Sequence, residues 1–240
     1  MRQFVKNVIQ WVRKFLRDKF HQENELFPYY LTILISFGLF VVSLNVFVEI
    51  TDDLKEDELT LYDDYFTHQI QSFHHPSLIP VFQFITHMGD RFAYLIFIIA
   101  IGLFFFLKHG KWTFTIQTVL VLMLSSLSNL VLKRVINRDR PSLEHLVAVS
   151  TLSFPSGHAM SAMAFYGFLI YLCIRLSMPL WLKMILSFAL GLLILLIGIS
   201  RIYLGVHFPS DVLAGFIGGL IWVTFCAILF NIIDIYRKKA

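Results

Sequence analysis

Three short polar blocks in this chain carry residue types suited to holding an anion. They read KRVINRDRP at 133–141, PSGH at 155–158 and SRIYLGVHFPSD at 200–211. Arginine offers a planar fork of N–H donors that fits the oxygens of a phosphate group. Ser156 and Gly157 stand at an expected helix start, where free backbone N–H groups and the positive end of the helix dipole favour an anion. The three blocks together predict a phosphate site.

The third block also offers a nucleophile or base. His207 and Asp211 are four residues apart, and Pro209 between them suits the first turn of a helix. The carboxylate can therefore reach one nitrogen of the imidazole around that turn, which leaves the other nitrogen free to act. A single histidine at the end of an apolar segment is usually interfacial, so it is the context of the three blocks that favours a catalytic role for His158.

The sequence around the blocks is that of a membrane protein. It has 240 residues and is 57% hydrophobic, whereas soluble domains are about 45–50% apolar. Runs of about 17–25 apolar residues predict transmembrane helices. Such runs lie at roughly 29–50, 92–107, 113–136, 158–174, 180–199 and 210–234. We therefore expect an all-α, polytopic bundle of six transmembrane helices over residues 29–240. Cys173 and Cys226 fall inside apolar runs and are expected to be small core residues.

The charges predict how the bundle is oriented. Six spans put both termini on one side, and that side holds 13 of the 20 Lys and Arg with a net charge of +9, against −5 on the other side. The positive-inside tendency then places both termini in the cytoplasm and the three blocks at the extracytoplasmic face. Residues 1–28 are expected to form a basic amphipathic arm on the inner leaflet. This arm and the charge bias explain the basic balance, so nucleic acid is not expected as a partner.

A minority of the basic residues lies on the side that the topology disfavours. They are Lys55, Arg91, Lys133, Arg134, Arg138, Arg140 and Arg201. An anion is the obvious reason for such a group. Arg134 and Arg138 either contact a lipid head group or extend toward the lipid surface.

Other polar groups on the same face are expected to have no chemical role. The acidic run over residues 52–64 is predicted to be a solvated loop, since its spacing does not match an EF-hand. The His74–His75 pair is predicted to form a turn rather than a metal site. His87 and His145 are predicted to be loop residues.

The spacing of the three blocks resembles the signature of the type 2 phosphatidic acid phosphatase family, which shares its core with vanadium haloperoxidases. That signature is K-x6-R-P, P-S-G-H and S-R-x5-H-x3-D, and all eleven fixed positions are matched here. The resemblance implies a vanadium-haloperoxidase-like phosphatase core within the six-helix bundle and a reaction that needs no metal or other cofactor.

The resemblance also implies a role for each matched residue. His207 would attack phosphorus and form a phosphohistidine, Asp211 would orient it, and His158 would protonate the leaving oxygen and later activate water. The residues implied to hold the phosphoryl oxygens are Lys133, Arg140, Ser156, Gly157 and Arg201. Ser200 either belongs to that set or bonds locally within its helix.

A site at the outer membrane boundary, without a large soluble domain, predicts a phosphate attached to a lipid. The resemblance is closest to enzymes of the phosphatidylglycerophosphatase B type in bacterial cell membranes, which implies phosphatidylglycerol phosphate, phosphatidic acid or polyprenyl diphosphates as substrates. A dedicated undecaprenyl-diphosphate phosphatase is the alternative, although several of those carry Asp at the position of Gly157. A lipid-binding or transport protein without catalysis would be expected to lose a catalytic residue or to show internal repeats. Nothing in the sequence indicates an oligomeric state.

Overall fold

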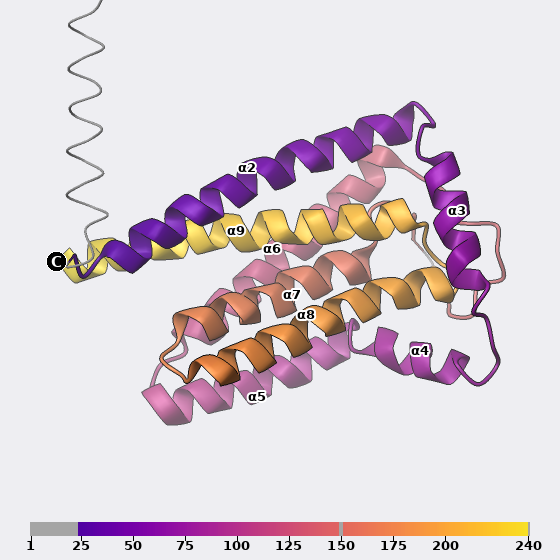
Figure 1. Ribbon diagram of the computed structural model, residues 1–240. Coiled ribbons are helices and arrows are strands. Elements are labelled where there is room, and N and C mark those ends of the chain that lie inside the picture. The colour runs from indigo at the N-terminus through magenta and orange to yellow at the C-terminus, as the bar shows by residue number, and fades with distance from the viewer. Residues whose placement is uncertain (1–23, 149–150, 240) are drawn as a thin grey trace, which may run out of the picture. The chain divides into compact units, whose positions relative to one another are not determined.

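The computed structural model describes residues 24–148 and 151–239, and these residues form eight α-helices and no strand. In chain order the helices are α2 (Phe27–Lys55), α3 (Thr60–Gln71), α4 (Ile79–His87), α5 (Arg91–His109), α6 (Thr113–Ile136), α7 (Gly157–Arg175), α8 (Leu180–Tyr203) and α9 (Pro209–Lys239), as labelled in Figure 1. Six of them, α2 and α5 to α9, are long and apolar enough to cross a membrane. The predicted all-α architecture with six spans is confirmed. Most of the expected amphipathic arm lies outside the described residues.

Packing divides the described chain into two compact units. One unit holds residues 24–41 and 224–239, and within it the rings of Phe40 and Phe225 lie 6.1 Å apart. The other unit holds residues 42–223 and carries all three polar blocks. The predicted domain boundary at residue 28 stays a prediction.

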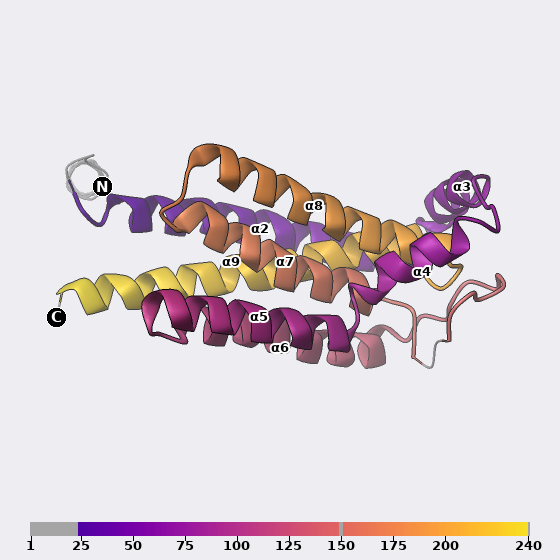
Figure 2. The same ribbon diagram turned by 90° about the horizontal axis from the view of Figure 1, so that it is seen from below.

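Helix α7 forms the centre of the larger unit. It lies against α6 on one side and α8 on the other (Figures 1 and 2). Its Phe165 and Tyr166 are buried together with Tyr94 of α5 and Ile197 of α8. The outer faces of α5 and α8 instead expose large apolar side chains, such as Phe92 and Phe188. Apolar surface of this extent is expected of helices that face lipid.

Two glycines one turn apart bring α9 close to α7. A Cβ atom on Gly215 would lie 2.7 Å from the carbonyl oxygen of Ser156, and one on Gly219 would lie 2.5 Å from that of Met160. Small residues at this spacing let membrane helices approach closely. The approach joins the starts of the two helices, because the Ser156 N–H donates to the carbonyl of Asp211 at 2.9 Å.

The stretch between α2 and α5 is more ordered than the sequence indicated. Helix α3 occupies residues 60–71 and α4 occupies residues 79–87, and both pack against α8 (Figure 2). The prediction of a loop over residues 52–64 is therefore wrong for both of its ends, because residues 52–55 belong to α2 and residues 60–64 to α3. The helices α3 and α4 bring acidic and basic side chains to the end of the bundle where the three blocks meet.

Candidate active site

His207 lies between α8 and α9, Asp211 lies in the first turn of α9, and both are buried. The Nδ1 atom of His207 is 3.3 Å from Oδ2 of Asp211, and the same carboxylate oxygen accepts the backbone N–H of Phe208 at 2.9 Å. The hydroxyl of Ser153 also donates to this oxygen. The carboxylate thus holds Nδ1 of His207, and Nε2 is left for chemistry.

The environment of His207 keeps its imidazole neutral. Burial is the main reason that the pKa of His207 is lowered to about 3, against the hydrogen bond to Asp211, which raises it. The nearby charges of Arg201 and Arg140 lower this pKa further. The contact with Asp211 is therefore a hydrogen bond rather than an ion pair at neutral pH. A neutral ring with a free Nε2 is the form that can act as a nucleophile.

Behind Asp211 lies a buried ion-pair network that the sequence did not predict. Arg138 donates from Nη1 to Oδ1 of Asp211 and from Nη2 to Oδ2 of Asp63, each at 2.7 Å. Both oxygens of Asp63 also accept from Ser210, from its N–H at 2.8 Å and from its hydroxyl at 2.7 Å. Arg138 does not extend toward lipid, because its guanidinium is mostly buried against two carboxylates, so that interpretation of its side chain is wrong. Contact of Arg138 with a lipid head group stays a prediction.

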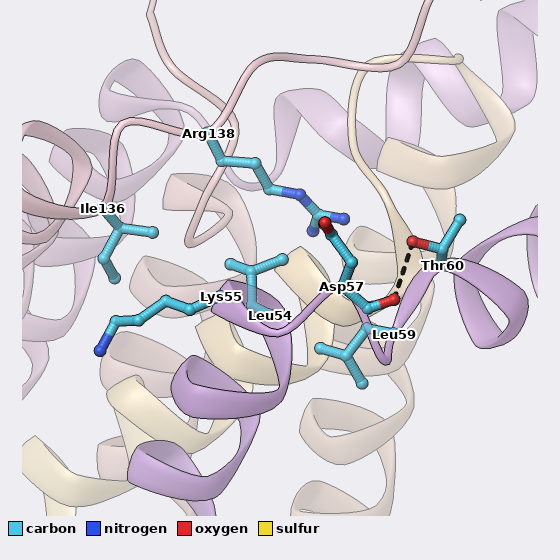
Figure 3. A pocket seen from close by; sticks show the side chains of 7 residues that line it. All are labelled: Leu54, Lys55, Asp57, Leu59, Thr60, Ile136 and Arg138. Atoms are coloured by element: carbon cyan, nitrogen blue, oxygen red, sulfur yellow. Dashed lines mark hydrogen bonds between the residues drawn. The ribbon is translucent and has the colours of Figure 1, made fainter.

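Arg138 is reached from a hollow between the end of α2 and the start of α3. Figure 3 shows its guanidinium pointing toward the turn at Asp57, where the Thr60 hydroxyl donates to the Asp57 carbonyl at 3.1 Å. Leu54 and Ile136 line the other part of this hollow. The network that holds Asp211 is thus close to the surface of the larger unit on the side of Arg138.

Three cationic side chains from three elements are placed around His207. Arg140, in the loop after α6, has Nη1 3.4 Å from Nε2 of His207 and 2.5 Å from the carbonyl of Val206. Lys133, in the last turn of α6, donates to the carbonyls of Leu152 and Ser153. These backbone bonds fix the positions of the charges and leave further donors unused.

Arg201 has a donor without a partner. Its side chain is only 4% exposed, and Nη1 donates to the Thr86 hydroxyl of α4 at 2.7 Å. Its Nε atom is buried and has no hydrogen-bond partner in the part of the chain that the structure describes. A buried charged donor left unsatisfied is costly and calls for an explanation. An anion bound between Arg201 and the other cations would satisfy it.

The second block forms the start of α7. Ser156 is the N-cap, and its side chain accepts from the N–H of Ala159 at 3.5 Å. A Cβ atom on Gly157 would lie 3.1 Å from Oδ1 of Asn129, so the site has little room for a side chain there. The Nδ2 of Asn129 in turn donates to the carbonyl of Pro155 at 3.0 Å. The helix therefore begins with an open end that suits an anion.

His158 is held by a carboxylate that the sequence analysis missed. Its Nε2 is 2.7 Å from Oδ1 of Asp90, and Oδ2 of Asp90 is 2.7 Å from Nδ1 of His87. The hydrogen bond with His158 is the main cause that lowers the pKa of Asp90 to about 2, so this carboxyl is ionised at neutral pH. His87 is the last residue of α4 rather than a loop residue and takes part in this chain of contacts.

Ser200 and His145 bond locally. The Ser200 hydroxyl donates to the carbonyl of Ile197 in its own helix at 2.6 Å, which is one of the two roles expected of it. The Nε2 of His145 is 3.0 Å from the carbonyl of Pro141. No group of three or more His, Cys, Asp or Glu within the described ranges is placed to hold a metal ion.

Two hollows open beside the site, and Leu130 lines both of them. The first, which we call the cationic hollow, is lined by Leu130, Lys133, Arg134, Asp139, Arg140, Thr151 and Leu152. The second, the apolar hollow, lies among α5, α6 and α7 and has a volume of about 680 Å³. The residues that line it include Asp90, Arg91, Tyr94, Leu95, Ile98, Leu122, Leu130 and His158. The apolar hollow therefore joins a membrane-facing surface to His158.

The chain is similar to a known protein family and to known phosphatases. The family model described as the PAP2 superfamily matches residues 114–233. Phosphatidylglycerophosphatase B of Bacillus subtilis (strain 168) is 41% identical over 149 residues, which cover 61% of this chain and 72% of that protein. Decaprenylphosphoryl-5-phosphoribose phosphatase of Mycolicibacterium smegmatis is 37% identical over 89 residues, or 35% of this chain and 43% of that protein.

Two crystal structures have a similar fold. The transmembrane PAP2 type phosphatidylglycerolphosphate phosphatase from Bacillus subtilis matches with a TM-score of 0.74 and 33% identity, over 80% of this chain and 95% of that one. LpxE of Aquifex aeolicus matches with a TM-score of 0.52 and 28% identity, over 69% of this chain and 92% of that one. The similarity extends over most of the helices described above.

Proposed function

The chain belongs to the PAP2 superfamily and is a multi-pass membrane lipid phosphatase, and on this premise we propose that it works through a phosphohistidine on His207. One observation carries the proposal: Asp211 holds Nδ1 of a buried, neutral His207, while Nε2 of the same ring faces Arg140 at 3.4 Å. A phosphoryl group bound by Arg140 would therefore lie directly in front of the free nitrogen. The matched spacing of the three blocks supports the same assignment.

The first step transfers the phosphoryl group to the enzyme. Nε2 of His207 attacks phosphorus, and the bond between phosphorus and the leaving oxygen breaks with its electron pair on that oxygen. His158 donates a proton to the leaving oxygen, so the lipid leaves as a neutral hydroxyl or as a protonated phosphate. The Asp211 carboxylate then stabilises the positive charge on the phosphorylated ring.

The second step returns the enzyme to its starting state. His158, now neutral, takes a proton from a water molecule that attacks phosphorus. The N–P bond breaks, its electron pair returns to Nε2 of His207, and inorganic phosphate is released. General acid–base catalysis of this kind contributes about 10²–10⁴-fold.

The phosphoryl oxygens are proposed to be held by the cations and the open helix end around His207. Lys133, Arg140 and Arg201 supply positive charge, and the unpartnered Nε of Arg201 supplies a donor. Ser156 and Gly157 supply backbone N–H groups at the start of α7. Fixed donors in a buried site stabilise the charge of the transition state without reorganisation. We assign Ser200 to the support of α8 because its hydroxyl bonds within that helix.

Asp90 is proposed as a positioning residue for His158. It binds Nε2 at 2.7 Å, so the ring presents Nδ1 to the substrate. The site would then contain two histidine–carboxylate pairs that differ in the ring nitrogen that the carboxylate contacts. Asp211 contacts Nδ1 of His207, and Asp90 contacts Nε2 of His158. Each pair fixes one nitrogen and frees the other.

The substrates are proposed to be lipids that carry a terminal phosphate: phosphatidylglycerol phosphate, phosphatidic acid and polyprenyl diphosphates. The apolar hollow beside His158 can take the first part of a lipid chain, and the relatives named above include a phosphatidylglycerophosphatase and a phosphatase of a decaprenyl lipid. A dedicated undecaprenyl-diphosphate phosphatase is the second candidate. We propose a bacterial inner membrane because of the similarity to phosphatidylglycerophosphatase B of Bacillus subtilis. The charge distribution supports an orientation with both termini in the cytoplasm and the site on the extracytoplasmic face.

The test is phosphate release from detergent-solubilised lipids by the parent protein, His207→Ala and His145→Ala. His145 is the matched control, since the one hydrogen bond of its ring among the described residues is to a nearby backbone carbonyl. The parent and His145→Ala should release phosphate from at least one of the lipids named above, and His207→Ala should release none. Near-normal turnover by His207→Ala would show that the phosphohistidine route is wrong.

A further inference from the structure

We propose that Arg91 forms a subsite for a second negative charge on the leaving group of the lipid substrate. This inference rests on the proposed function, because it assumes that His207 attacks and His158 protonates. The subsite would distinguish lipid phosphates by the charge of the lipid product that remains after the phosphate is removed. It would favour lipids whose product is still an anion.

The direction of the reaction places the leaving group near Arg91. In phosphoryl transfer the attacking and leaving atoms lie roughly in line, on opposite sides of phosphorus. Arg140 and Lys133, which flank His207, line the cationic hollow, whereas His158 lines the apolar hollow. Since His158 protonates the leaving oxygen, the leaving group must extend into the apolar hollow.

Arg91 is the one lysine or arginine among the described residues that line the apolar hollow. It directly follows Asp90, whose carboxylate is 2.7 Å from His158. Adjacent Cα atoms are about 3.8 Å apart, so the backbone of Arg91 is anchored close to the acid that protonates the leaving oxygen. A flexible arginine side chain can reach an anion next to that oxygen.

The guanidinium of Arg91 is available for such an anion. Its one contact within the described ranges is with the ring of Phe92, whose centroid is 5.7 Å from Cζ. Lys133, Arg140 and Arg201, in contrast, each donate to at least one protein oxygen. The charge and the N–H donors of Arg91 therefore have no carboxylate or carbonyl partner within the described ranges.

The position of Arg91 is electrostatically unfavourable without a partner. It is the first residue of α5, and a cation at the N-terminus of a helix opposes the helix dipole. It also lies on the face that the charge distribution assigns to the outside, where basic residues are disfavoured. Binding of an anion would offset both effects.

The proposed substrates differ in the charge that Arg91 would meet. A polyprenyl diphosphate leaves as a polyprenyl phosphate, and phosphatidylglycerol phosphate leaves as phosphatidylglycerol, which keeps its phosphodiester anion. Phosphatidic acid leaves as neutral diacylglycerol. Arginine binds phosphate oxygens through two parallel N–H donors. Arg91 should therefore favour the first two substrates over the third.

The experiment compares two substrates that share one tail, farnesyl diphosphate and farnesyl monophosphate, in the same detergent micelles. Initial rates of phosphate release give kcat/KM for the parent protein, Arg91→Gln and Arg91→Lys. Arg134→Gln is the matched control, because Arg134 is also exposed but lines the cationic hollow and not the apolar one. The same variants are tested with phosphatidylglycerol phosphate and phosphatidic acid.

Arg91→Gln should lower kcat/KM for farnesyl diphosphate by on the order of 10–100-fold, the usual effect of losing a hydrogen bond to a charged group, with little change for the monophosphate. Arg91→Lys should recover part of the loss, and Arg134→Gln should leave the ratio of the two substrates unchanged. Equal losses on both substrates, no loss on either, or the same selective loss in Arg134→Gln would overturn the subsite. If the parent hydrolysed none of the four lipids, the proposed function itself would fail, and the subsite with it.

Discussion

Asp63 and Arg138 form a buried ion pair, with 2.7 Å between Oδ2 and Nη2, although 75 residues separate them in the chain. The other arm of the same guanidinium pairs with Asp211 at 2.7 Å. Helix α3 is thereby connected to Asp211, whose other carboxylate oxygen contacts His207. Removing one member of a buried pair leaves an uncompensated charge, which destabilises a protein strongly.

We predict that Arg138→Gln destabilises the protein by about 3–5 kcal/mol and lowers kcat more than it raises KM. The loss of kcat is expected because Asp211 would no longer be held against His207. Thermal inactivation in detergent measures the stability, and phosphate release measures kcat and KM. Asp63→Asn should also destabilise the protein, but it should lower kcat less than Arg138→Gln does, because Asp63 does not contact Asp211.

A double-mutant cycle tests whether the two residues act as a unit. The double variant Asp63→Asn, Arg138→Gln should be more stable than the sum of the two single effects implies, by about 0.5–3 kcal/mol. Strict additivity of the two changes would contradict the ion pair.

The sequence predicted the spans and the three blocks because both depend on local patterns. Apolar runs mark helices that cross a membrane. The fixed spacings within each block can be recognised in the sequence without knowing how the helices pack. Asp63 was missed because an acidic run usually faces water. Its helical phase was the available signal, since Leu59 and Ile70 lie on the same face of the helix and pack onto the core.

Asp90 had no comparable signal. It is 68 residues from His158 in the chain, and only the packing of the α4–α5 turn against α7 brings the two together. Arg138 stood at a variable position of the first block, so the signature gave it no role. The residues that hold His207 and His158 thus come from tertiary contacts, whereas these two histidines could be proposed as candidates from spacing alone.

Asp90→Asn should change the pH dependence of the reaction. The pKa of Asp90 is lowered from its ordinary 3.8 to about 2, mainly by the hydrogen bond with His158. Because the folded state lowers this pKa, the stabilisation from the carboxylate is fully present above about pH 4 and is lost as the pH falls through about 2. The carboxylate is therefore charged throughout the working range and favours the protonated form of the His158 ring.

In the Asn variant that attraction is absent, so we expect the alkaline limb of the kcat/KM profile to move to lower pH. KM at the acidic plateau should change little, since Asp90 does not touch the phosphoryl oxygens. His87→Ala is the control, because it removes the other partner of the same carboxylate. An unshifted alkaline limb in Asp90→Asn would contradict the positioning role.

His158→Ala should affect substrates according to their leaving groups. An alkoxide needs a proton to leave, and we expect a loss of about 10²–10⁴-fold on phosphatidic acid. A phosphate leaves more readily because its second pKa is about 6, so the loss on farnesyl diphosphate should be smaller. The measurement is the turnover rate of the parent and the variant on both substrates. An equal loss of turnover rate on the two substrates would show that His158 is not the general acid.

Chelation and vanadate test the charge that surrounds the phosphate. We predict that turnover persists in excess EDTA, since Lys133, Arg140 and Arg201 supply the positive charge that a metal would otherwise supply. Vanadate, which can take the five-coordinate geometry of the transition state, should inhibit competitively. Activity lost in EDTA and restored by added magnesium would contradict this description of the site.

The sidedness of the site rests on charge. The cytoplasmic face is predicted to carry a net +9 and the opposite face −5, although the basic residues of the three blocks lie on the latter. Lys133, His158 and Arg201 lie at the ends of α6, α7 and α8 that share one face, and Lys239 is at the far end of α9 from Asp211. A lipid phosphate made on the inner leaflet would then have to cross the membrane before hydrolysis.

We predict that a cysteine at Ser142 is labelled from outside the cell and a cysteine at Lys239 is not. Both substitutions are made in a variant that lacks Cys173 and Cys226, and intact cells or spheroplasts are treated with a thiol reagent that cannot cross the inner membrane. Ser142 directly follows the first block, so its label reports the face of the site. Permeabilised cells should label both positions, which controls for access. Labelling at 239 but not at 142 in intact cells would reverse the topology, and the enzyme would then act on lipids of the inner leaflet.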